Sequence, residues 1–103
     1  MKSVNTQEFE TILSSNDLVV ADFYADWCMP CKMLSPILDE VACDYPQITF
    51  VKVNVDQNED LARKYKIDFI PNVIAFRNAS RKDSFTGVKT KEQLKEIFDN
   101  LIG

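Results

Sequence analysis

The spacing of hydrophobic residues changes along the chain, and each spacing predicts a different element. Residues 18–24 are almost continuously apolar, which is typical of a central strand covered on both faces. A similar apolar run at 48–55 predicts a second strand. Shorter runs at 72–77 and 83–85, on either side of a turn at 78–80, predict a hairpin. The sequence therefore contains the strands of a sheet.

Helical spacing occupies the segments between these strands. Asn5 and Glu8 form a capping-box pattern, so we expect the first helix to begin there. A longer helix is predicted at 29–45, with a kink at Pro36 because proline removes one backbone hydrogen bond. A short helix is expected at 59–65. The last helix is capped by Thr90 and Gln93, and its apolar stripe consists of Leu94, Ile97, Phe98 and Leu101.

Strands that alternate with helices, followed by a hairpin and a closing helix, predict an α/β fold with a parallel core sheet covered on both faces. A length of 103 residues fits one domain. We see no repeats, linkers or low-complexity segments. The prediction is a single domain that spans residues 1–103.

Composition narrows the classes of function. Hydrophobic residues make up 46% of the chain and charged residues 27%, as in ordinary globular proteins. The net charge of −4 argues against a nucleic-acid partner or an anionic membrane, which both favour basic surfaces. No apolar run approaches the roughly 20 residues that span a bilayer. Residues 1–8 turn polar at once and lack the apolar core of a signal peptide, so we expect a cytoplasmic protein.

Two of the three cysteines lie three residues apart, where the first long strand passes into a helix. This spacing places the Cβ atoms of Cys28 and Cys31 about 5–6 Å apart, close enough for a disulfide. At the helix N-terminus the free amides and the helix dipole favour a thiolate, so Cys28 is the expected nucleophile. Cys31, one turn further, is expected to be more buried and to act as the resolving thiol. Pro30 suits the first helical turn, where its missing N–H has no partner.

A zinc site is the main alternative for paired cysteines, but a structural zinc ion needs four ligands. The chain has no histidine, and Cys43 lies roughly 18 Å along the helix from Cys31. Two chains would have to share such an ion. Cys43 sits opposite the apolar stripe of its helix and is expected to be exposed. It is either an unremarkable surface residue or a site of oxidative dimerisation.

The segment Phe23–Lys32 resembles the active-site segment of the thioredoxin family. The resemblance continues through Met33–Pro36, residues 51–56, Ile70–Pro71 and residues 86–88, and it covers essentially the whole chain. It implies the thioredoxin fold, in which a central mixed β-sheet is flanked by helices on both faces.

The resemblance also implies roles for individual residues. Asp22 matches a buried carboxylate that helps to move a proton to or from the resolving cysteine, and Lys52 matches a lysine close to it. Pro71 matches a cis-proline that turns the backbone of Ile70 towards substrate, where an extended peptide can pair with it. The apolar surface around Cys28 is implied to consist of Trp27, Met29, Pro30, Ile70, Gly87 and Val88.

The implied activity is reduction of disulfides in protein substrates through a Cys28–Cys31 disulfide. Thioredoxin reductase would regenerate the dithiol, with no bound cofactor and no metal, and the protein is expected to be a monomer. Two alternatives stay open. One is an oxidase or isomerase with the same fold, although those relatives more often carry histidine between the cysteines. The other is a binding module that uses the surface without the chemistry.

The sequence departs from the common family pattern at several positions. Met29 replaces the usual glycine between the cysteines, and Phe69 and Asn72 flank the Ile–Pro pair where other residues are usual. The turn at 78–80 lacks glycine, although Asn78 tolerates a left-handed conformation. These differences bear on reduction potential and choice of partner, and leave the predicted fold intact.

Overall fold

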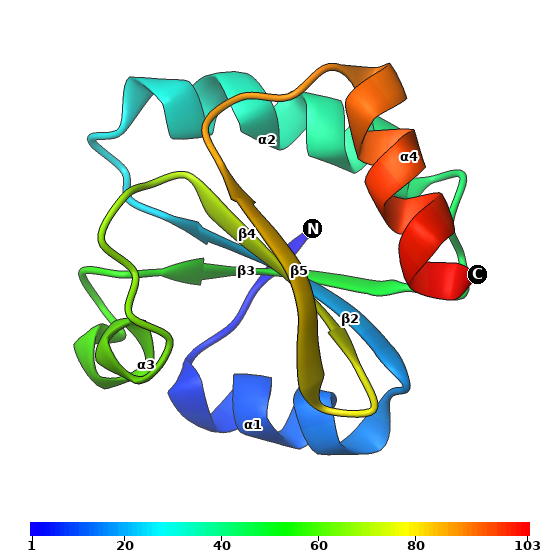
Figure 1. Cartoon of the computed structure of the whole chain (residues 1–103). Coiled ribbons are helices and arrows are strands. Elements are labelled where there is room, and N and C mark those ends of the chain that lie inside the picture. The colour runs from blue at the N-terminus through cyan, green and yellow to red at the C-terminus, as the bar shows by residue number, and fades with distance from the viewer.

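The structure is a computed structural model that describes all residues, 1–103. Five strands form one sheet, and four helices pack around it (Figure 1). In chain order the elements are β1 (Lys2–Ser3), α1 (Thr6–Ser15), β2 (Leu18–Tyr24), α2 (Met29–Ala42), β3 (Thr49–Asn54), α3 (Glu59–Lys64), β4 (Asn72–Arg77), β5 (Ser80–Thr86) and α4 (Lys91–Ile102).

The sheet is mixed, with the strand order β1-β3-β2-β4-β5. β3 runs parallel to both β1 and β2, whereas β4 is antiparallel to β2 and β5. The predicted parallel core is therefore confirmed for β1, β3 and β2, and the hairpin adds two antiparallel strands. In the centre of the sheet Asp22 lies beside Lys52 of β3 and Val73 of β4.

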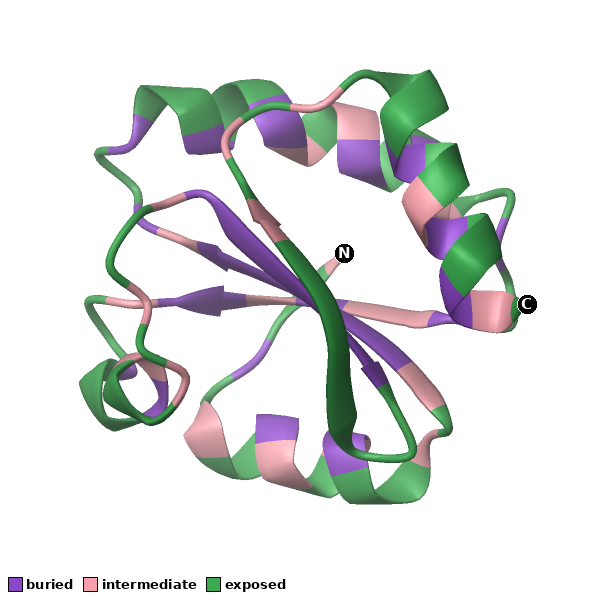
Figure 2. Cartoon of the chain, viewed as in Figure 1, coloured by how far each residue is buried: buried purple, intermediate pink, exposed green.

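Alternate residues of β2 point to opposite faces of the sheet, and each face is covered by two helices. α1 and α3 cover one face, where an apolar cluster includes Phe9, Phe23, Leu61 and Phe76. α2 and α4 cover the other, where Leu34, Leu38, Leu94 and Phe98 pack against Val20. Figure 2 shows the buried side of each helix turned towards the sheet. The expected arrangement, with helices on both faces, is confirmed.

Both predicted capping boxes are present. In α1 the Glu8 amide donates to Oδ1 of Asn5 (2.8 Å), and the Asn5 amide donates to Oε1 of Glu8 (3.0 Å). In α4 Thr90 and Gln93 make the same reciprocal pair, at 2.9 and 3.2 Å. None of the four helices combines the length and the hydropathy needed to cross a lipid bilayer.

Several boundaries differ from the prediction. α2 continues through Pro36 but ends at Ala42, because Cys43, Asp44 and Tyr45 bond to carbonyls three residues back in a tighter turn. β5 begins at Ser80 rather than 83. Its first residues are all exposed, so pairing with β4 and not apolar alternation makes them a strand.

The turn before β5 has the predicted left-handed backbone at Asn78, whereas the N-terminal strand β1 was not expected. Asn78 has the positive φ (50°) that its residue type tolerates, and Ala79 also has a positive φ (66°). β1 was not predicted, because two exposed polar residues carry no hydrophobic pattern. It is a strand because it pairs with β3.

Candidate active site

A Cys28–Cys31 disulfide lies where β2 passes into α2, as the cysteine spacing predicts. Cys28 is the N-cap of the helix, Pro30 lies in its first turn, and the two Cα atoms are 5.3 Å apart. The amide of Cys31 donates to Sγ of Cys28 (3.2 Å). A helix amide aimed at this sulfur favours its thiolate form once the disulfide is reduced.

In this oxidised state the expected difference in burial between Cys31 and Cys28 is small, because both cysteines are buried. Cys28 is 4% exposed and Cys31 3%. Both pack in one small cluster with Ala25, against Val55 and Ile70. These two residues come from segments far along the chain and pack against the cluster that contains both cysteines.

Asp22 lies in β2 on the face covered by α2 and is only 1% exposed. Burial raises the pKa of this carboxyl from 3.8 to about 7. The positive charge of Lys52 opposes the rise, and the negative charge of Asp39 adds to it. Oδ1 of Asp22 is buried without a hydrogen-bond partner. Such a group can take up or release a proton near neutral pH.

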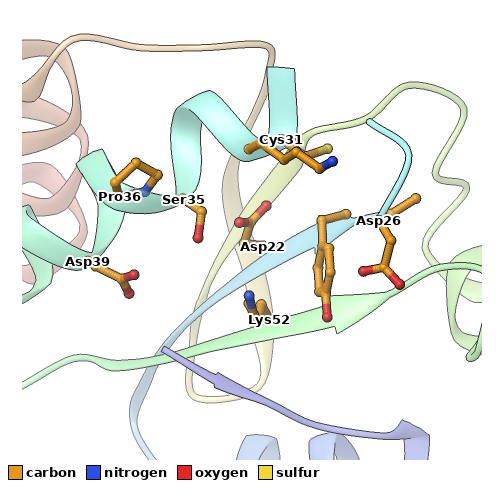
Figure 3. Close-up of a pocket in the computed structure, with 10 residues that line it drawn as sticks. Asp22, Asp26, Cys31, Ser35, Pro36, Asp39 and Lys52 are labelled. Atoms are coloured by element: carbon orange, nitrogen blue, oxygen red, sulfur yellow. The ribbon is translucent and has the colours of Figure 1, made fainter. Parts of the chain in front are cut away.

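A cleft of about 510 Å³ opens between α2 and the sheet, and Asp22 and Cys31 line it together. Figure 3 shows Cys31 and Ser35 on the α2 side of this space, with Asp22 and Lys52 on the side of the sheet. The other lining residues are Tyr24, Ala25, Asp26, Lys32, Pro36 and Asp39. The cleft gives the buried carboxyl and Cys31 a shared route to solvent.

Lys52 does not form an ion pair with any carboxylate of the chain. Its Nζ lies instead 4.7 Å from the centroid of the Tyr24 ring. The hydroxyl of Tyr24 is hydrogen-bonded to that of Ser3 in β1 (3.0 Å). Sequence reasoning gave Tyr24 no role, because this contact depends on which residues of β2 and β3 face each other.

Exposed apolar side chains surround the disulfide. Trp27 is 68% exposed and Met29 65%, and Val88 is 40% exposed. Pro30 is also exposed, whereas Ile70 and Gly87 are half-buried and Pro71 is buried. Phe69, one of the departures from the family pattern, is 74% exposed and extends the apolar character of the segment next to Ile70.

The Ile70–Pro71 peptide bond is cis, as the family resemblance implies. The amide of Gly87 donates to the carbonyl of Pro71 (3.0 Å), which ties the segment before α4 to this loop. Gly87 has φ +81°, a conformation that L side chains rarely adopt. The N–H and C=O of Ile70 make no hydrogen bond within the chain, so both are available to another chain.

Sequence reasoning also missed Asp56. Its Oδ2 accepts a hydrogen bond from Nε1 of Trp27 (2.8 Å), which holds the exposed indole in place. The amide of Asp56 in turn donates to Oδ1 of the buried Asn54 (2.9 Å), and Asn58 donates to the Asn54 carbonyl (3.0 Å). A run of polar residues directly after a strand of the parallel core was the available signal, because such strand ends gather functional groups.

Cys43 and Asn72 are the other residues that the sequence analysis singled out. Cys43 is free and exposed at the end of α2, as expected. No group of three or more His, Cys, Asp or Glu side chains is arranged to hold a metal ion. Asn72 is buried, and its Oδ1 has no hydrogen-bond partner.

The mixed sheet, the CxxC disulfide at a helix N-terminus and the buried carboxyl behind it define a thiol–disulfide oxidoreductase of thioredoxin fold. The thioredoxin family model matches residues 1–100. The chain belongs to the thioredoxin family, whose members reduce protein disulfides.

Relatives with this name match over most of their length. A thioredoxin from Mycoplasmoides gallisepticum is 47% identical over 93 residues, which cover 90% of this chain and 93% of that protein. A thioredoxin from Rickettsia bellii is 38% identical and covers 97% of both chains. The solved structure of Plasmodium falciparum thioredoxin superposes with a TM-score of 0.91 at 34% identity, covering 97% of this chain and 98% of that one.

Proposed function

We propose that Cys28 and Cys31 reduce protein disulfides in two exchange steps. The Cys28 thiolate attacks one sulfur of a substrate disulfide, whose other sulfur leaves as a thiolate. Cys31 then loses its proton and attacks Sγ of Cys28, so the Cys28–Cys31 disulfide forms and the second substrate sulfur is released. Two electrons pass from the dithiol to the substrate. The disulfide at the start of α2, beside a buried carboxyl, carries this proposal.

Asp22 is the acid–base group of the second step. As a carboxylate it accepts the proton that Cys31 releases, and it can return a proton through the cleft. A pKa of about 7 supports this role, because both protonation states are then populated near neutral pH. The positive charge of Lys52 stabilises the carboxylate of Asp22, so the ionised form is populated in spite of its burial.

The substrate binds on the apolar surface beside the disulfide. The residues we assign to it are Trp27, Met29, Pro30, Ile70, Pro71, Gly87 and Val88. The free N–H and C=O of Ile70 support the binding of an extended peptide as an added strand. Exposed Trp27 and Met29 would then contact the side chains that flank the substrate cysteine.

The protein acts as a single domain, residues 1–103, without a cofactor other than its own disulfide. Thioredoxin reductase regenerates the dithiol. We place the protein in the cytoplasm as a monomer, where a free exposed thiol such as that of Cys43 stays reduced. The single sheet with helices on both faces supports the assignment of one domain.

The test is a trapping experiment with three single variants. With a purified disulfide-containing protein as substrate, Cys31→Ser is expected to accumulate a mixed disulfide through Cys28. Cys28→Ser is expected to trap nothing, and the matched surface control Cys43→Ser to turn over like the wild type. Trapping by Cys28→Ser, or none by Cys31→Ser, would contradict the assignment of nucleophile and resolving thiol.

A further inference from the structure

We propose that Tyr24 is a positioning residue, which holds the ammonium group of Lys52 against its aromatic ring and keeps it from pairing directly with the carboxylate of Asp22. The proposal concerns the site described above and rests on the proposed function of Asp22. It assigns a task to an aromatic side chain that takes no part in the two proposed exchange steps.

The register of the sheet would allow a direct ion pair between Asp22 and Lys52 in place of the contact with Tyr24. Asp22 and Lys52 are partners on neighbouring parallel strands, and both line the cleft under α2. Opposite charges at such positions normally attract each other into contact. The ammonium of Lys52 is nevertheless in no ion pair and lies 4.7 Å from the centre of the Tyr24 ring, within the range of a cation–π interaction.

Two contacts fix the ring of Tyr24 in this position. Its hydroxyl is hydrogen-bonded to Ser3 (3.0 Å), which places the edge strand β1 behind it. Its apolar part packs against the cluster of Ala25, Cys28 and Cys31. Tyr24 also lies two residues after Asp22 on β2, so both side chains emerge from the same face of the sheet. The ring is therefore a fixed surface for the lysine.

The charges around Asp22 show what this placement achieves. Lys52 faces it from β3, and Lys32, Asp39 and the Cys31 sulfur lie on the α2 side of the cleft, with Asp26 beyond the end of β2. Asp39 is itself paired with the amino group of Met1 (2.6 Å). Of the two lysines, only Lys52 lowers the pKa of Asp22, so its position decides how strongly the carboxylate is stabilised.

A cation in direct contact stabilises a carboxylate and lowers its pKa by about one to three units. Asp22 would then stay ionised at neutral pH and would return protons poorly. With the ammonium held at the ring, the pKa of Asp22 remains at about 7. Tyr24 therefore sets the pH range in which the carboxyl can exchange protons.

The experiment follows the titration of the Asp22 carboxyl carbon by NMR in the oxidised protein, where the Cys28–Cys31 pair does not titrate. Tyr24→Leu removes the ring, and we expect the pKa of Asp22 to fall by about one unit or more as Lys52 moves into contact. Tyr24→Phe keeps the ring and loses only the hydroxyl, so it is expected to titrate like the wild type. Equal titration curves for Tyr24→Leu and the wild type would overturn the proposal.

Loss of the Tyr24 ring also admits water to the cleft, and water alone could change the pKa of Asp22. Repeating the substitution in a protein without the Lys52 charge separates the two effects. In a Lys52→Met protein the pKa of Asp22 is expected to rise, and adding Tyr24→Leu is expected to change it little. An unchanged effect of Tyr24→Leu in that background would also overturn the proposal. In the wild type, ring currents are expected to shift the ε-methylene protons of Lys52 upfield; their absence would refute the contact even if Tyr24→Leu does not fold.

These outcomes are distinct from a failure of the proposed function. If the titration follows the prediction but Cys31→Ser traps no substrate, Tyr24 positions Lys52 in a protein whose thiol chemistry is different. If trapping succeeds and the titration does not depend on Tyr24, the exchange mechanism stands and this inference fails.

Discussion

The two faces of the sheet are built from the same alternating strands but serve different purposes. On the face covered by α1 and α3, the apolar cluster is rich in aromatic side chains, among them Phe9, Phe23 and Phe76. Phe9 makes edge-to-face contacts with Phe23, Phe76 and Tyr65, with ring centroids 5.8–6.4 Å apart. On the face covered by α2 and α4, the apolar cluster stops short of Asp22, and an open polar cleft takes its place.

The difference shows how a small protein separates stability from reactivity. Each strand contributes alternate residues to the two faces, so one face can be packed for stability while the other carries a buried carboxyl. An ionisable group buried without a partner costs stability. The aromatic contacts of the opposite face help to offset that cost. Three measurements test this division, in order of decreasing expected effect.

The largest effect is the pH dependence caused by Asp22. Its folded pKa of about 7 lies above the ordinary value of 3.8, so the folded state retains a proton that the unfolded chain loses. The contribution of Asp22 to the free energy of unfolding is therefore fully present below about pH 4 and decreases by about 4 kcal/mol as the pH rises to about 7, at 1.36 kcal/mol per unit of pKa. Above pH 7 the contribution is constant.

Asp22→Asn is expected to abolish this dependence and to be more stable than the wild type at neutral pH. Urea denaturation of the oxidised protein between pH 4 and 8 measures both effects. Asp68→Asn is the matched control, since its carboxylate is exposed. A variant at Asp22 that kept the wild-type slope would assign the pH dependence to other groups.

A pair of core truncations then compares the faces directly. Leu61→Ala, on the α1 and α3 face, is expected to cost about 2–3 kcal/mol, because the short helix α3 can shift into the space that is left. Leu38→Ala, within the longer helix α2, is expected to cost about 3–4 kcal/mol. Only Leu38→Ala should move the pKa of Asp22, since α2 forms a wall of the cleft. If both variants shifted the pKa of Asp22 equally, the packing of the α1 and α3 face would affect the carboxyl as much as the packing of α2 does.

The smallest effect concerns the contact between Trp27 and Asp56, which follow the C-terminal ends of β2 and β3. Asp56→Ala removes the acceptor of the Trp27 indole, which is already largely exposed, so the loss of unfolding free energy is expected to stay below about 1 kcal/mol. Trp27 is the only tryptophan of the chain, so its fluorescence reports the change directly. We expect a changed emission spectrum and a decrease in kcat/KM of less than about tenfold. An emission spectrum like that of the wild type would show that Asp56 does not hold the indole.

Much of this arrangement could be predicted from local sequence. Capping boxes act over three residues, and the apolar run of β2 marks a central strand without knowledge of its neighbours. The cysteine pair was equally accessible, because its spacing and its place at the start of α2 follow from local sequence. The role of Asp22 came from family resemblance, and its burial agrees with that role.

The parts that were missed depend on contacts between distant segments. The contact of Tyr24 with Lys52 needs the register of β2 against β3, and that of Trp27 with Asp56 needs the path of the loop after β3. The near-equal burial of the two cysteines depends on Val55 and Ile70. No periodicity in one sequence contains this information, because it follows from how the elements pack.

The position of β2 at the centre of the sheet has a consequence for protein synthesis. β2 pairs with β3 and β4, and both follow it in the chain. On the ribosome, the last residue of β4, Arg77, is added 53 residues after Tyr24. At 5–20 residues per second the apolar strand β2 waits roughly 3–10 s for its second neighbour. During translation this strand is therefore the segment of the nascent chain that most needs protection from aggregation.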